Sequence, residues 1–517
     1  MTQVLVIGAG PAGLAAATAA SALGAEVTVL DSSYDLGGQY WRHLPSTRPT
    51  ASEGILHHGF ERFRELRERL ENDSHVRILT LSQVWAIDRN PDTRIAEDSS
   101  VGGRWRVHVL QGVPDGHDRL ALTIIPDAIV FATGAHDRTL PFPGWQLPGV
   151  FSAGAAQAMA KGERVAVGSR VVVSGAGPFL LPVAASLVQA GAKVLGVYEA
   201  STISRLASGW LPRPWQLLGA SGKALELAGY VGNHLRNRIP YRTGRAVIAA
   251  EGDGRVERVV VARLDADWAP IVGSSRTIEA DAVCIGHGFT PRLELPIAVG
   301  CALSAERFVA VDHRQATSSP GVFAAGEITG IGGVDAALAE GSIAGHSAAG
   351  GSDEDAAVSR QRRIRTASTR FAARIEAAHG IRPGWSQWLT PDTLVCRCEE
   401  VSYGRLCDTA AHTGSAGLRS LKLSTRAGLG ICQGRVCGRT VEDLLGRLAA
   451  GGLIDTTSTD RRPIVSPIRL GELAGGTVVS PAPPPPGNTE EPSNTEEPGN
   501  TEEPGNTEEP GNIEERE

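Results

Sequence analysis

Four of the seven cysteines form two close pairs late in the sequence. Cys396 and Cys398 are separated by one residue and Cys432 and Cys437 by four, with 33 residues between the pairs. Four thiolates suit either a tetrahedral Zn²⁺ or a [2Fe–2S] cluster. Structural zinc sites usually separate the cysteines of a pair by two to four residues, so the C-x-C pair favours the cluster. We therefore expect a [2Fe–2S] centre on these four cysteines, with zinc as the alternative.

Glycines surround the second cysteine pair. They leave backbone N–H groups free to point at cluster sulfurs, and such hydrogen bonds tune the reduction potential of a cluster. These glycines are Gly428, Gly430, Gly434 and Gly438.

A glycine-rich motif of the G-x-G-x-x-G type opens the chain. It follows the apolar run 3–7 and precedes an alanine-rich segment, which predicts a strand, a tight turn and a helix. In such a unit the three glycines allow the turn, the approach of a pyrophosphate and the packing of helix on strand, and the helix N-terminus favours the phosphates. An acid about 20 residues further on is expected to bind the ribose hydroxyls, and Asp31 fits. The motif is Gly8-Ala9-Gly10-Pro11-Ala12-Gly13.

A second motif of this kind begins at Gly175. Gly177 follows it, and Glu199 ends the next predicted strand, but Leu180 stands where the third glycine belongs. A bulky residue there changes the packing of helix on strand. Glu199 would repel a 2′-phosphate, so NAD(H) or another adenine nucleotide is favoured over NADP. The residues leave open whether this is a working NAD(H) site or a structural or non-redox nucleotide site.

The other cysteines and the histidines give weaker evidence for a reactive site. Cys284 and Cys301 form no C-x-x-C pair, and together with Cys407 they are interpreted as small buried hydrophobic residues. The remaining candidates for acid–base chemistry are interpreted as loop or cofactor-lining residues rather than general bases. They are His43, His136 and His287.

Composition limits the class of protein. The chain has 517 residues and a net charge of −7, but residues 487–517 contain eleven Glu and one Arg, so the rest of the chain is near +3. A nearly neutral body gives no electrostatic footprint for nucleic acid. We expect no membrane span, because no apolar run approaches about 20 residues. The N-terminal run lacks the basic start of a signal peptide, so we expect a cytoplasmic protein, with membrane association through partners left open.

These elements predict an α/β protein with two Rossmann-like dinucleotide-binding domains, a small C-terminal iron–sulfur domain and a disordered acidic tail. The tail consists of GNTEEP repeats with almost no apolar side chains, which cannot offset the entropy of ordering. The expected domains are a discontinuous first nucleotide domain (1–150 and 284–350), an inserted second one (151–283), a helical connector (351–390), the cluster domain (391–450), an extension (451–480) and the tail (481–517).

Three further segments identify a resemblance. The sequences GGQYWR (37–42), VFATG (130–134) and VFAAGE (322–327), together with the first glycine motif, resemble the two-dinucleotide-binding-domain flavoprotein family. The resemblance implies FAD in the first fold. The family usually has Asp where this chain has Glu327. The residues that the resemblance and the motif assign to FAD are Gly8, Gly10, Ala12, Gly13, Asp31, Gly38, Gln39, Gly134, Gly326 and Glu327.

The segment 391–445 resembles the bacterioferritin-associated-ferredoxin-like [2Fe–2S] domain. Over the whole chain, the segments 132–157, 286–295 and 461–474 add a resemblance to one flavoprotein group. That group holds the A subunits of opine oxidases, the B subunits of hydrogen cyanide synthases and the α subunits of dye-linked proline or hydroxyproline dehydrogenases. In it, this type of chain works with a flavoprotein of the glycine/sarcosine-oxidase type, and a small ferredoxin-like chain is a further expected partner.

Three functions follow as hypotheses. The first is an α-type subunit of a heteromeric amino-acid or opine dehydrogenase or oxidase, which relays electrons from the C–N bond of a substrate to an acceptor. The second is an independent NADH-dependent reductase of diaphorase type. The third is an electron-transfer or assembly subunit without turnover of its own.

Overall fold

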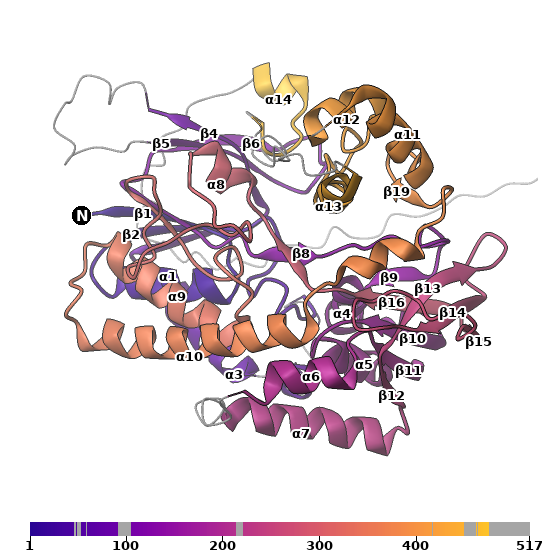
Figure 1. Ribbon diagram of the computed structural model, residues 1–517. Helices are drawn as coiled ribbons and strands as arrows, with labels where there is room; N and C mark the ends of the chain where they lie inside the picture. The colour runs from indigo at the N-terminus through magenta and orange to yellow at the C-terminus, as the bar shows by residue number, and fades with distance from the viewer. Residues whose placement is uncertain are drawn as a thin grey trace, which may run out of the picture. The chain divides into compact units, whose positions relative to one another are not determined.

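Five parallel strands form the sheet of the first nucleotide fold, in the order β18-β7-β1-β2-β3. Figure 1 labels β1 and β2 of this sheet. Helices cover it, so β1 and β7 read as continuous apolar runs. The predicted strand, turn and helix at the N-terminus are confirmed. The elements are β1 (Gln3–Ile7), α1 (Pro11–Ser21), β2 (Glu26–Leu30), α2 (Glu53–Leu56), α3 (Phe60–Glu71), β3 (Val76–Leu79), β7 (Ala128–Phe131), β18 (Val322–Ala324) and α9 (Gly333–Ala348).

The computed structural model describes residues 1–45, 48, 53–57, 59–90, 105–212, 221–415, 417–448, 462 and 464–474. All of them belong to one unit of the chain, 1–479. The predicted disordered tail lies outside the described residues.

The second fold repeats the plan of the first. Its five parallel strands have the order β12-β11-β10-β16-β9. In each fold a three-stranded antiparallel meander precedes the last strand of the sheet in chain order: it lies between β3 and β7 in the first fold and between β12 and β16 in the second. In the first fold β18 joins the sheet later in the chain. The meanders are β4 (Ser82–Arg89), β5 (Trp105–Gln111) and β6 (Leu120–Ile124), and β13 (Arg245–Glu251), β14 (Arg258–Arg263) and β15 (Arg276–Glu279).

The predicted boundary between 283 and 284 falls inside β16, which pairs with β10 and β9. We therefore propose that the inserted fold ends after Gly286. Its elements are β9 (Val150–Ser152), α4 (Ala153–Gly162), β10 (Arg170–Gly175), α5 (Leu180–Gln189), β11 (Lys193–Glu199), α6 (Ile203–Trp210), α7 (Ser221–Arg236), β12 (Tyr241–Thr243) and β16 (Ala282–Gly286).

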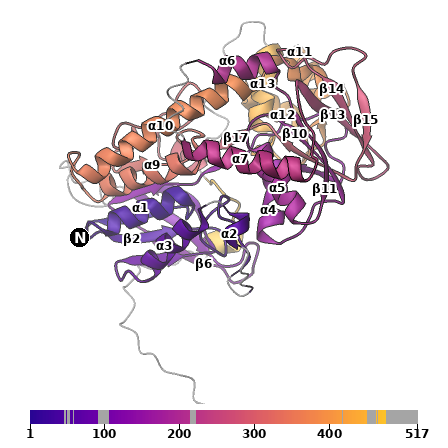
Figure 2. The same cartoon turned by 90° about the horizontal axis from the view of Figure 1, so that it is seen from below.

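Two short antiparallel strands join the folds: β8 (Ala135–Asp137) and β17 (Phe289–Pro291), followed by α8 (Glu294–Ala298). A long helix, α10 (Ala356–His379), then packs on α9 and reaches α6 of the second fold, as both views show (Figures 1 and 2). This helix lies within the predicted connector (351–390), whose bounds stay a prediction.

The C-terminal part of the chain packs on both folds. Its core is continuous with the second fold, because the side chains of Cys396 and Leu444 share one buried cluster with Trp268 and Ala200. Among the described residues, no helix is both long and apolar enough to cross a membrane. The elements are η3 (Pro383–Trp388), β19 (Leu394–Cys396), β20 (Val401–Ser402), α11 (Tyr403–Thr413), α12 (Leu418–Thr425), α13 (Gly438–Leu448) and α14 (Leu470–Ala474).

Candidate functional site

The first glycine motif forms the turn between β1 and α1. A Cβ added to Gly13 would lie 1.7 Å from the carbonyl oxygen of Gly8, and one added to Gly8 would lie 2.3 Å from that of Ala132. These two positions are therefore glycine because the protein's own backbone fills the space. Gly10 differs, since a Cβ there would lie 3.9 Å from its nearest protein neighbour, Gly38 Cα. Gly10 thus leaves space in front of a helix N-terminus, which fits the approach of a pyrophosphate.

Asp31 lies directly after β2, beside this turn. Its carboxylate accepts hydrogen bonds from the backbone N–H groups of Ala9 (2.6 Å) and Ser33 (2.8 Å). The side chain remains partly exposed. The position agrees with the predicted contact to a ribose.

The turn after β18 carries Gly326 and Glu327. Gly326 packs on α1, because a Cβ there would lie 2.9 Å from Ala12 Cβ. Burial, and next the charge of Asp137, raises the pKa of Glu327 to about 7. Sequence reasoning missed Glu340 of α9, which holds this turn: its carboxylate accepts from Gly326 N (2.8 Å) and Thr329 Oγ1 (2.7 Å). An acid in the middle of an alanine-rich helix was the available signal.

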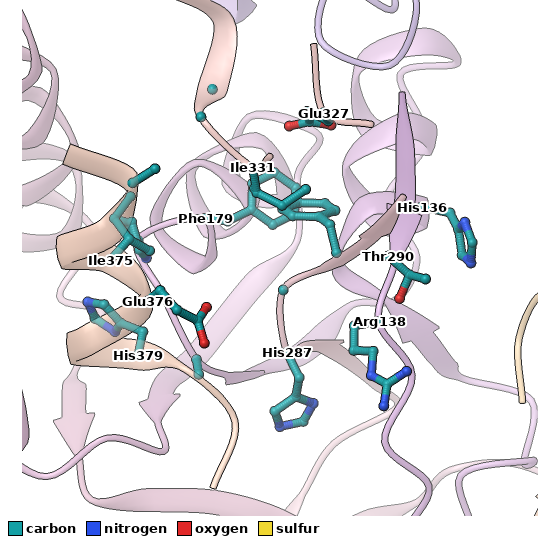
Figure 3. Close-up of a pocket in the computed structure, with 18 of the residues that line it drawn as sticks. His136, Arg138, Phe179, His287, Thr290, Glu327, Ile331, Ile375, Glu376 and His379 are labelled. Atoms are coloured by element: carbon teal, nitrogen blue, oxygen red, sulfur yellow. The ribbon is translucent and has the colours of Figure 1, made fainter. Parts of the chain in front are cut away.

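A cavity of about 1710 Å³ lies between the two folds. Tyr40 of the first fold lines it. Glu327 and Ile331 of the first fold and Phe179 of the second also line it (Figure 3). Gln39 is exposed. Gly134 begins the crossing between the folds, and its carbonyl accepts from Arg292 N (3.0 Å). Of the candidate FAD residues, Glu327 lines this cavity, whereas the glycine loop and Asp31 are not among its lining residues.

The second glycine motif departs from the first in its helix. The helix α5 begins five residues after Gly175, whereas α1 begins three residues after Gly8. Leu180 is fully buried against the sheet, so the chain runs on as a turn before the helix can start. A Cβ at Gly175 would lie 1.7 Å from the carbonyl oxygen of Gly286, which explains why this glycine is kept.

Glu199 ends β11 and is fully buried. Burial raises its pKa, but the contact with His379 and the N–H groups of Ser201 and Gly177 outweigh this effect and lower the pKa below its ordinary value. Like Asp31, Glu199 thus accepts one N–H from its glycine loop and one from the residue two positions later, but it has no exposed surface.

The three predicted lining histidines have different places. His43 packs on Phe60 and Phe63, and its Nδ1 donates to the carbonyl of Trp41 (2.7 Å). His287 lines the cavity and contacts the rings of Trp268 and Trp388, and burial lowers its pKa to about 4. His136 also lines the cavity (Figure 3).

The two cysteine pairs meet. The thiol of Cys437 hydrogen-bonds to both Cys396 and Cys432, and Cys432 also contacts Cys398. Hydrogen bonding from Cys437, followed by backbone N–H groups, lowers the pKa of Cys396 to about 6 and that of Cys432 to about 4 against the effect of burial. The N–H groups belong to Gly428 and Glu399 for Cys396, and to Val436 and Gly434 for Cys432.

These contacts fit an iron–sulfur cluster, because the sulfurs of the two pairs contact one another and backbone donors favour the thiolates of Cys396 and Cys432. Burial raises the pKa of Cys398, and hydrogen bonding with Cys396 and Cys432 raises that of Cys437. Within the described ranges, no three His, Cys, Asp or Glu side chains are already spaced as metal ligands. The fit therefore rests on the pairwise sulfur contacts and on the backbone donors. Of the other cysteines, Cys284 and Cys301 are buried and free as expected, whereas Cys407 is only partly buried.

The cysteine loop sits against the crossing strand β8. His136 Nε2 donates to the carbonyl of Arg435 (2.9 Å), and Arg435 Nε is 2.7 Å from Glu294 Oε1. Two residues after His136, the buried Arg138 pairs with Asp443 of α13 (2.5 Å). The sequence did not reveal this interface, which joins residues about 300 positions apart.

The matching families agree with both sites. The chain belongs to the pyridine nucleotide-disulphide oxidoreductase family, whose model matches residues 2–341. Residues 394–447 match the BFD-like [2Fe-2S] binding domain. The protein is thus an FAD-dependent oxidoreductase with a C-terminal [2Fe–2S] domain.

Relatives cover nearly the whole chain. The A subunit of opine oxidase from Agrobacterium tumefaciens is 32% identical, over 91% of both chains. Hydrogen cyanide synthase subunit HcnB of Pseudomonas aeruginosa is 30% identical over 86% of this chain and 92% of that protein. Among solved structures, L-proline dehydrogenase from P. horikoshii shares the fold, with a TM-score of 0.61 and 20% identity over 91% of this chain and 79% of that chain.

Proposed function

We propose that this chain is the electron-relaying α-type subunit of a heteromeric dehydrogenase or oxidase that acts on the C–N bond of an amino acid or opine. Two relatives that span most of the chain are themselves called subunits, of opine oxidase and of hydrogen cyanide synthase. The partner that we propose is a glycine/sarcosine-oxidase-like flavoprotein that holds the amine substrate, and the relayed electrons leave to a separate acceptor.

One contact between the candidate flavin site and the cysteine loop supports the proposed relay. Gly134, a candidate FAD residue, is two residues from His136, and Arg435 is two residues from Cys437. The hydrogen bond from His136 to the Arg435 carbonyl joins these two short segments. The candidate flavin site and the cysteine loop are therefore linked by few covalent bonds and one hydrogen bond of 2.9 Å.

FAD exchanges two electrons with a substrate or one at a time with a carrier, and a [2Fe–2S] cluster carries one electron, so the pair converts between the two modes. The chain's own residues keep the two sites at a fixed separation. The pairs of Arg138 with Asp443 and of Arg307 with Glu442 hold α13, and Thr440 Oγ1 donates to the carbonyl of Thr139 (2.6 Å). A rigid interface matters here because electron transfer slows steeply with distance.

The test measures transfer from flavin to cluster by stopped-flow absorbance in the holoprotein. His136→Ala removes the hydrogen bond to Arg435, so we expect slower transfer at unchanged FAD and iron content. His136→Gln keeps an N–H donor and is expected to restore most of the rate.

Thr440→Val is the matched control. It removes one hydrogen bond across the same interface, worth about 1 kcal/mol, but leaves the link through His136 intact. We expect weaker docking and a rate near that of the wild type. Equal rates for His136→Ala and the wild type would contradict the proposed path.

The partner is tested separately. The chain alone and the chain with the co-purified flavoprotein are mixed anaerobically with candidate amino acids or with NADH. Bleaching by an amino acid only in the presence of the partner supports the proposal. Bleaching of the isolated chain by NADH would instead indicate the diaphorase function.

A further inference from the structure

Glu199, the acid of the second dinucleotide fold, is shielded from solvent by other residues of the chain. Both oxygens of Glu199 have partners: Ser201 N donates to Oε1 (3.0 Å), and Gly177 N (2.9 Å) and Tyr241 Oη (3.3 Å) donate to Oε2. His379 Nδ1 lies 3.2 Å from the same Oε2. The Glu199 carboxylate has no exposed surface.

The first fold supplies an internal comparison. Asp31 also accepts one N–H from the glycine loop and one from the residue two positions later, yet it stays partly exposed. A ribose needs such an acid to be accessible, because its hydroxyls donate to the carboxylate. The two acids thus occupy equivalent places, and the second fold adds Tyr241 and His379 on top of Glu199.

His379 is the last residue of α10, and contacts on the side of its ring away from Glu199 hold it in place. Trp210 Nε1 donates to His379 Nε2 (3.3 Å), and Arg374 Nη1 donates to the carbonyl of Trp210 (2.8 Å). An indole N–H only donates, so Nε2 is the accepting nitrogen and the proton of the neutral ring is on Nδ1, facing Glu199. The helices also touch closely, since a Cβ at Gly209 would lie 2.6 Å from Ala378.

We propose that the end of α10 closes the ribose subsite of the second dinucleotide fold, and that His379 is the specificity-determining residue that excludes NAD(H). The glycine loop itself is still accessible, because Gly177 and Phe179 line the cavity between the folds. His379, Glu376 and Phe179 lie around one side of that cavity (Figure 3). The closure therefore covers the adenosine end of the subsite and leaves the phosphate loop facing the cavity.

The closure around Glu199 holds whether or not the chain relays electrons. Its consequence for the flavin is selectivity. NADH cannot anchor its adenosine end in the second fold, so it cannot hold its nicotinamide beside the flavin. The flavin is then reserved for electrons from another donor.

The experiment measures binding of ADP-ribose to the holoprotein by isothermal titration calorimetry. ADP-ribose has the ribose and pyrophosphate of NADH but no nicotinamide, so binding is separated from flavin chemistry. FAD is present in excess to keep the first fold filled. We expect no binding to the wild type up to about 1 mM, the upper end of usual substrate affinities. His379→Ala is expected to bind with a dissociation constant between about 1 μM and 1 mM.

Two further variants sharpen the result. His412→Ala is the control, since His412 lies in the last turn of another helix, α11, and is exposed. It should behave as the wild type. Glu199→Gln added to His379→Ala should weaken ADP-ribose binding by about tenfold or more, the worth of hydrogen bonds to a charged group. If His379→Ala does not fold, His379→Ser, which is smaller than histidine and still polar, replaces it.

Binding of ADP-ribose by the wild type with the affinity of His379→Ala would overturn the proposal. So would a folded His379→Ala or His379→Ser, with normal FAD content, that still does not bind. Trp210 gives an independent signal, because loss of the ring that its indole N–H contacts changes its fluorescence and a bound ligand changes it again.

Discussion

Glu340→Gln tests how α9 holds the turn that carries Glu327. Burial raises the pKa of Glu340 from its ordinary value of 4.5 to about 7, against the hydrogen bond from Thr329. Between these two pH values the folded carboxyl keeps a proton that the unfolded chain has lost, so the free energy of unfolding falls as pH rises from 4.5 to 7. At 1.36 kcal/mol per pKa unit, the loss is about 3 kcal/mol at and above pH 7.

Glutamine at position 340 does not titrate, and its amide oxygen can still accept from Gly326 N and Thr329 Oγ1. We expect the variant to match the wild type near pH 5 and to be more stable at pH 8. For a domain of 150–250 residues, 1 kcal/mol corresponds to roughly 2–4 °C, so the gain in melting temperature at pH 8 is about 6–12 °C.

The assay is a thermal scan of the holoprotein by flavin fluorescence at several pH values between 5 and 8. Glu327, whose pKa is also raised to about 7, stays in both proteins, so its contribution cancels in the difference. The exposed Glu354→Gln is the control for the same chemical change. Melting curves of Glu340→Gln and wild type that differ by a constant amount at every pH would refute the reasoning.

Three further predictions concern the sites themselves. Gly10→Val should abolish FAD binding but keep the cluster, because a Cβ at this position meets only Gly38 of the protein and would fill the space left for the pyrophosphate. Normal FAD content would count against this loop. Cys432→Ala should remove the visible cluster absorbance and leave FAD bound; stoichiometric zinc without iron in the wild type would defeat the assignment. Arg138→Met removes the pair with Asp443 and should lower the stability of the cluster domain by about 1–3 kcal/mol, measured by visible circular dichroism on heating. An unchanged transition would show that this pair does not hold the domain.

Local pattern was sufficient for much of the fold. The apolar run, glycine turn and following helix at residues 3–21 predict a βα unit because all three depend on neighbours in sequence. The same reasoning located α10 and the four cysteines. It placed the end of the second fold within β16, because an apolar strand does not show which of two sheets it will join.

The contacts that decide function were not visible in the sequence. Glu199 and His379 are 180 residues apart, and His136 and Arg435 are 299 apart. No local propensity links such residues, since their meeting depends on how α10 and the cluster domain pack. The second glycine motif showed that Leu180 was unusual, but it gave no indication that a helix end covers the acid beside it.

The central question is whether electrons placed on the flavin reach the cluster of the same chain, and one measurement answers it most directly. The holoprotein, with FAD and iron content determined, is photoreduced anaerobically in small steps while flavin absorbance and the electron paramagnetic resonance signal of the cluster are followed. We predict that the cluster signal grows as the flavin bleaches. A fully bleached flavin beside a cluster that stays oxidised, or a preparation that contains no iron, would contradict this prediction.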